Sequence, residues 1–171
     1  MDYKSVSWDK YTDESLDFIL DQSEKLLEET FKSFREVINK SYIALAIYVS
    51  IISYCYNEII AYHTSIIKTI PYCVLICGTG YCIYLIWDNL FPTKMSFLGS
   101  QPRVLIDRYF EQFSDNDQIR VYKASKIADY DEGISTNKIQ IDKRNDNFKW
   151  SAKTLFMSIF ISLLFYWLCR P

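Results

Sequence analysis

The stretch that decides the fold is residues 42–90, YIALAIYVSIISYCYNEIIAYHTSIIKTIPYCVLICGTGYCIYLIWDNL, and a shorter one follows at 150–168, WSAKTLFMSIFISLLFYWL. Strongly polar groups interrupt the body of the first stretch only near Glu58, His63 and Lys68. The hydrocarbon of a bilayer is about 30 Å thick, and a helix needs roughly 20 largely apolar residues to cross it. The first stretch therefore predicts two membrane spans, and the second predicts one.

These spans predict an all-α membrane protein of four segments. Residues 1–41 form a long cytoplasmic amphipathic helix, 42–90 a two-span transmembrane hairpin, 91–149 a cytoplasmic helical segment, and 150–171 the third transmembrane helix with a short tail. A chain of 171 residues has room for one domain of ordinary size. The net charge of −2 gives no reason to expect a nucleic-acid partner, whereas the lipid bilayer is an expected one.

Basic residues on the segments that flank the spans predict the orientation. Ten Lys and Arg residues lie between the second and third spans, and four more lie in the last part of the N-terminal helix. Because such residues remain on the cytoplasmic side, we expect a multi-pass protein with its N-terminus in the cytoplasm. The basic run that enters the third span fits this role or binds anionic headgroups; its members are Lys138, Lys143, Arg144, Lys149 and Lys153.

Residues 13–40 have the pattern of an amphipathic helix. Thr12 or Asp13 offers an N-cap, and apolar residues follow at three- and four-residue spacing. Acidic residues precede basic ones by four positions in the pairs Asp21–Lys25, Glu28–Lys32 and Glu36–Lys40. No Pro or Gly intervenes before Tyr42, so we expect the helix to continue into the first span.

The apolar stripe of this helix, represented by Leu20, Leu27, Phe34 and Val37, must be covered. Two alternatives are open: packing against the chain's own middle segment, or a homo-oligomeric bundle. The stripe is also a candidate surface for a partner helix. A strict coiled coil fits less well, because Ser23 and Thr30 would occupy seam positions.

Breakers divide the predicted middle segment into helical hairpins. A first short helix over Leu105–Phe113 begins after Pro102, and a second ends at Gly133. A third, capped by Ser135 or Thr136, leads into the last span.

Small and polar residues inside the spans are the candidate pore or interface positions: Ser50, Ser53, Asn57, Glu58, Gly78 and Gly80. The two glycines allow neighbouring helices to approach closely, and the polar side chains can form interhelical hydrogen bonds or line a wetted lumen. Glu58 lies about 14 Å along the helix from the span centre at Val49, which also suits an interfacial carboxylate. In an oligomer, a ring of Glu58 side chains would favour cations.

No residue constellation predicts a reaction. His63 is the only histidine, and no cluster of acids or of the five cysteines has the spacing of a metal site. Nucleophile, phosphate-loop and zinc-protease motifs are missing from the sequence. We therefore expect no catalytic residue, cofactor or metal.

The junctions into the first and last spans, Phe31–Lys40 and Asp142–Asn145, carry a resemblance to a known group. The layout of amphipathic helix, two-span hairpin and charged cytoplasmic helices resembles the SLATT group and related small membrane effectors of bacterial antiphage systems. Those proteins have two spans, and the third is an addition. The resemblance implies an oligomeric pore-forming or depolarising effector of the bacterial inner membrane, triggered by a nucleotide signal or a protein partner. The alternatives are a non-conducting adaptor and an anchor or toxin-immunity subunit.

Overall fold

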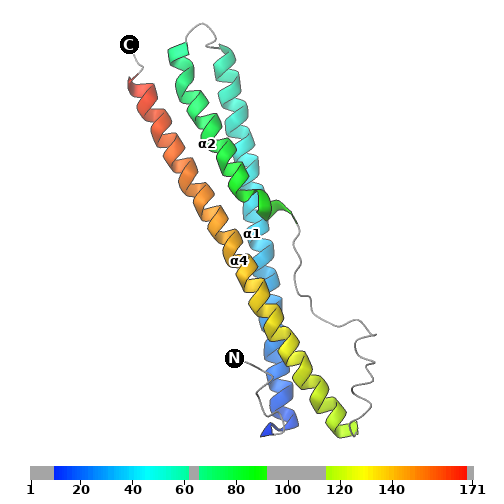
Figure 1. The fold of residues 1–171 in the computed structure, drawn as a ribbon. Coiled ribbons are helices and arrows are strands. Elements are labelled where there is room, and N and C mark those ends of the chain that lie inside the picture. Colours follow the sequence, from blue (N-terminus) through cyan, green and yellow to red (C-terminus); the bar gives the residue numbers. More distant parts are fainter. Residues whose placement is uncertain (1–9, 62–65, 92–114, 169–171) are drawn as a thin grey trace. The chain divides into compact units, whose positions relative to one another are not determined.

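The computed structural model describes residues 10–61, 66–91 and 115–168, whose regular structure is helical. The helices are α1 (Asp13–Ala61), α2 (Ile66–Leu90) and α4 (Asp115–Leu168) (Figure 1). All three are long and apolar enough to cross a membrane. For this part of the chain, the prediction of an all-α fold with three candidate spans is confirmed.

Helix α1 begins and continues as its sequence predicts. The Ser15 N–H donates to Thr12 Oγ1 at 3.2 Å, so Thr12 is the N-cap. The helix then runs for 49 residues. The three predicted acid–base pairs are present, with N–O distances of 2.6, 3.1 and 3.7 Å. Exposed pairs of this kind add only a few tenths of a kcal/mol each, so the packing of the apolar stripe is the larger stabilising contribution.

The chain divides into two compact units, and both α1 and α4 contribute to each of them. Unit 1 comprises Met1–Phe34 and Lys94–Gln140, and unit 2 comprises Arg35–Thr93 and Ile141–Pro171.

In unit 1, the first part of α1 packs against the first part of α4. Leu27, Tyr130 and Ile134 form the core of this contact, with Leu20 and Phe31 packed against it. The part of the stripe that holds Leu20 and Leu27 is thus covered by the chain's own middle segment. Residue numbers rise together along the two helices, since Glu24 bonds Tyr130 and Thr30 bonds Asn137, so the helices are parallel.

Thr30 is buried in this contact between α1 and α4, which we call the seam. Its polarity had counted against a coiled-coil arrangement. It is 5% exposed, and Asn137 Nδ2 donates to its Oγ1 at 3.1 Å. Buried residues of α4 recur here at three- and four-residue spacing, from Ile127 through Tyr130 and Ile134 to Asn137. A polar pair in such a seam fixes the register of the two helices, because slipping would leave both side chains without this partner.

The predicted break at Gly133 is wrong, and so is the new helix start at Ser135 or Thr136. All three residues lie inside α4, which is continuous for 54 residues. A mid-helix glycine costs about 1 kcal/mol relative to alanine. Continuous burial of the seam on both sides of Gly133 outweighs that preference. The predicted helix over Leu105–Phe113 lies outside the described residues.

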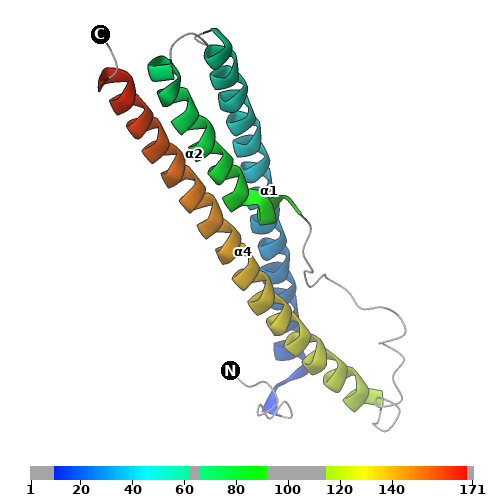
Figure 2. The same ribbon diagram turned by 45° about the horizontal axis from the view of Figure 1, so that its top comes forward.

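In unit 2, parts of α1, α2 and α4 lie side by side, as both Figure 1 and Figure 2 show. Helix α2 runs antiparallel to the other two. The core consists of Ala44, Tyr48, Cys82 and Ile86. Only 17–22% of the residues in the three span windows are buried inside the chain. Most apolar side chains of these windows are therefore at least partly exposed.

Candidate functional site: polar side chains of the helix bundle

Asn89, near the C-terminal end of α2, connects three helices of unit 2. Its Nδ2 donates to Ser41 Oγ on α1 at 3.1 Å and to the Arg144 carbonyl on α4 at 3.0 Å. Asn89 and Ser41 are both 0% exposed. One side chain therefore fixes the register of all three helices at this level. Asn89 Oδ1 is buried and has no hydrogen-bond partner among the described residues.

Arg144 caps the end of α2. Its guanidinium donates to the carbonyls of Asn89 and Phe91, both at 2.7 Å, and the residue is 2% exposed. The last carbonyls of a helix lack intrahelical partners and carry partial negative charge, which a cation stabilises. Burial lowers the pKa of the guanidinium, and Asp88 acts in the opposite direction. Arginine nevertheless stays charged at physiological pH.

A second polar layer joins the helices farther along the bundle. The hydroxyl oxygens of Tyr48 and Ser151 lie 2.7 Å apart. Ser151 Oγ donates to the Cys82 carbonyl, and the Cys82 thiol donates to the Ser151 carbonyl, each at 3.2 Å. All three residues are buried. Interhelical hydrogen bonds of this type hold helices together where lipid supplies no alternative partner.

The two candidate glycines have opposite surroundings. A Cβ added to Gly78 would lie 2.5 Å from Ser158 Cβ, so α2 and α4 approach closely there. A Cβ added to Gly80 would meet nothing within 4 Å. Beyond this crossing, Ser162 Oγ donates to the Pro71 carbonyl at 2.9 Å. Gly78 therefore belongs to a contact within the chain, and Gly80 lies on its outer surface.

The candidate pore positions of α1 lie on its outward side. Ser50, Ser53 and Asn57 are exposed, whereas Tyr48 and Cys55 are buried. At about 100° per residue, the three exposed positions share one face that points about 180° away from the buried pair. The two serine hydroxyls donate to carbonyls of their own helix, at 2.8 and 2.9 Å. Glu58 is half-buried and lies to one side of this face. We call Ser50, Ser53 and Asn57 the outer polar stripe.

An open apolar groove of about 670 Å³ adjoins the outer polar stripe. Its walls include Ala46, Ser50 and Tyr54 of α1, together with Leu75 of α2 and Ile159 of α4. The groove and the stripe share Ser50, so a helix seated in the groove would lie against the stripe.

The candidate partner residues lie inside the chain. Leu27 and Phe34 in unit 1 and Val37 in unit 2 are 1–8% exposed, and Leu20 packs on the unit 1 core. In the described structure, none of the four is on the open surface.

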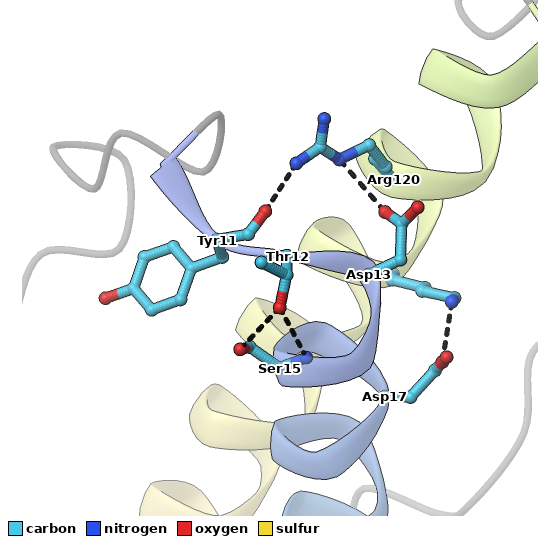
Figure 3. Close-up of polar contacts among 7 residues, drawn as sticks. Tyr11, Thr12, Asp13, Ser15, Asp17 and Arg120 are labelled. Atoms are coloured by element: carbon cyan, nitrogen blue, oxygen red, sulfur yellow. Dashed lines mark hydrogen bonds and ion pairs between the residues drawn. The ribbon is translucent and has the colours of Figure 1, made fainter.

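Ion pairs join the starts of α1 and α4 in unit 1 (Figure 3). Arg120 Nε lies 3.1 Å from Asp13, and Lys123 Nζ lies 2.6 Å from Asp17. Arg120 also donates to the Tyr11 carbonyl, directly before the N-cap. Both acids are more than half exposed, so these contacts are accessible to salt. We call these two pairs the terminal clasp.

No group of three or more His, Cys, Asp and Glu side chains suited to a metal ion occurs among the described residues. No family model, curated protein or solved structure matches the chain.

Proposed function

We propose that this chain is an oligomeric membrane effector that lets ions cross a bilayer and so depolarises the membrane. The outer polar stripe is the observation that carries the proposal. It points away from the chain's own core in an otherwise apolar part of α1. Hydrocarbon offers no hydrogen-bond partner to the Asn57 amide. A neighbouring copy or a water-filled lumen would supply one.

The apolar groove beside the stripe supports an assembly of several copies. A second copy seated there would cover apolar surface of three helices and place its own stripe close to the first. Glu58, which is half-buried and lies to one side of the stripe, would then recur around the axis. A ring of carboxylates at the mouth of a pore favours cations.

The proposal assigns no reaction to the chain. It places the N-terminus and residues 91–149 in the cytoplasm of a bacterium, on the basis of the distribution of basic residues. The setting in antiphage defence rests on the architectural resemblance alone. A cytoplasmic protein or a nucleotide signal would act on unit 1, where the terminal clasp holds the starts of two long helices.

A non-conducting adaptor or anchor, including a toxin-immunity protein, is the second candidate. Exposed apolar side chains on unit 1 favour it: Phe18 and Ile139 are each 66% exposed, and Ile119 is 55% exposed. These residues would replace the covered α1 stripe as the surface for a partner helix.

Ion flux from vesicles distinguishes the two functions. We expect the purified protein to release potassium from liposomes, and Glu58→Gln to reduce the preference for cations over anions. Ser53→Leu should block flux by filling the lumen, whereas Val49→Leu, an exposed position beside the stripe, should not. Absence of flux from a verified oligomer, with and without candidate triggers, would contradict the pore and favour the adaptor.

A further inference from the structure

Lys153 is a charged residue within a largely apolar part of α4. It follows Trp150 by three residues, at the start of the apolar run that ends at Leu168. Its ammonium lies 4.8 Å from the centroid of the exposed Trp150 ring. Because Trp150 precedes it, the side chain turns back toward the polar part of α4. Lysines at the edge of a span adopt this direction when their stem lies along apolar surface and their charge seeks the headgroups.

No carboxylate of the described chain balances this charge. Three other lysines of unit 2 form ion pairs, and Lys153 forms none with the described residues. Lys40 contacts Glu36, Lys143 contacts Asp88, and Lys149 contacts Asp146. The sequence has no Asp or Glu after Asp146. Residues 42–57 of α1 and 69–87 of α2, which form the rest of the bundle around this level, carry no charged side chain. Among the described residues, Lys153 therefore has no carboxylate as its counter-ion, and an anion of the surroundings can take that place.

We propose that Lys153 and Trp150 bind the phosphate of an anionic phospholipid on the outer face of α4. The ammonium supplies the charge, and the exposed indole N–H lies at the depth where tryptophan prefers the interface. Headgroups without a cationic group are favoured, since choline or ethanolamine would repel the lysine. This inference rests on the proposal that α4 crosses a membrane.

Fluorescence quenching by brominated lipids tests the site. A variant with Trp150 as its only tryptophan (Trp8→Phe, Trp87→Phe, Trp167→Phe) is placed in vesicles of equal parts phosphatidylglycerol and phosphatidylcholine. Either one lipid or the other carries brominated chains. We expect Trp150 quenching to report about fivefold enrichment of phosphatidylglycerol next to the indole. A lysine near an anionic surface contributes roughly one kcal/mol, and this free energy corresponds to that ratio.

Two lysine variants separate a site from a general charge effect. Lys153→Gln should abolish the enrichment, while Lys149→Gln, whose ammonium already contacts Asp146, should retain most of it. Native mass spectrometry of the chain with all its tryptophans should show the same loss of bound phosphatidylglycerol. Equal quenching by both lipids would overturn the lipid site alone. Absence of quenching by either lipid would contradict the membrane crossing as well.

Discussion

At the scale of single residues, Arg144 shows how a cation is accommodated in unit 2. Taking a guanidinium out of water is costly unless its hydrogen bonds are replaced. Here the carbonyls of Asn89 and Phe91 replace two of them, and the end of α2 gains a cap. The lowered pKa of Arg144 reflects the desolvation that remains. Because the group stays charged throughout the neutral range, its contribution to stability should not change between about pH 6 and 8.

Arg144→Met should destabilise the folded chain by about 3 kcal/mol, because the carbonyls of Asn89 and Phe91 lose their charged partner. Unfolding in detergent with increasing denaturant measures the effect. The matched control is Lys143→Met, whose ion pair with Asp88 is long at 3.9 Å and exposed, and which should change stability by less than about 0.5 kcal/mol. Equal effects of the two substitutions would contradict the capping role.

The sequence analysis predicted neither the burial of Arg144 nor its contact with the end of α2. Because Arg144 belongs to a run of basic residues, its position in the sequence suggests a determinant of membrane orientation. A signal for its burial does exist, since it continues the spacing Ile134, Asn137, Ile141 that marks the covered face of α4. Polar residues at two of these four positions hide that periodicity from hydropathy. The partner of Arg144 was not predictable, because helix C-terminal carbonyls leave no signature in a sequence.

At the scale of helices, α1 was predicted closely and α4 was not. The cap, the ion pairs and the continuity of α1 depend on neighbours within four residues, which sequence spacing records directly. Whether α4 breaks at Gly133 depends instead on α1 covering both sides of that glycine. Local preference suggested a turn, and tertiary packing decided otherwise.

The crossing of α2 and α4 predicts opposite results at two glycines. Gly78→Ala should destabilise the bundle by about 1–3 kcal/mol, because the new methyl group collides with Ser158. Gly80→Ala should be neutral or stabilising by up to about 1 kcal/mol, because the site is open and alanine favours a helix. Thermal unfolding in detergent compares the two. A larger loss at Gly80 than at Gly78 would contradict the close approach.

The terminal clasp predicts a salt-sensitive start of α1. Arg120→Gln removes the contacts to Asp13 and the Tyr11 carbonyl, so amide exchange over the first turns of α1 should accelerate about two- to fivefold at low salt. The difference should shrink near 1 M salt, where exposed charges are screened. Lys25→Gln, in a pair within α1, is the control and should leave the exchange of this end unchanged. A salt-independent difference would indicate lost packing and contradict an electrostatic clasp.

At the scale of the whole molecule, any function must be consistent with two properties. These are the three apolar helices and the outer polar stripe of α1. Hydropathy predicted the spans, because burial in lipid demands long uninterrupted apolar runs. Which side of α1 faces outward was not predictable, since the sequence shows small polar residues on several faces. Ser50, Ser53 and Asn57 lie on the side of α1 opposite the buried Tyr48 and Cys55, and the pore proposal depends on that placement.

Cysteine labelling along α1 tests the wetted face most directly. In the assembled protein, with its native cysteines replaced by alanine, single cysteines at Ser50, Ser53 and Asn57 should react with a membrane-impermeant thiol reagent. Cysteines at Val49 and Tyr56, which are also exposed in the isolated chain, should face lipid and stay unreacted. Uniform reactivity, or none at the three stripe positions, would contradict a lumen lined by α1.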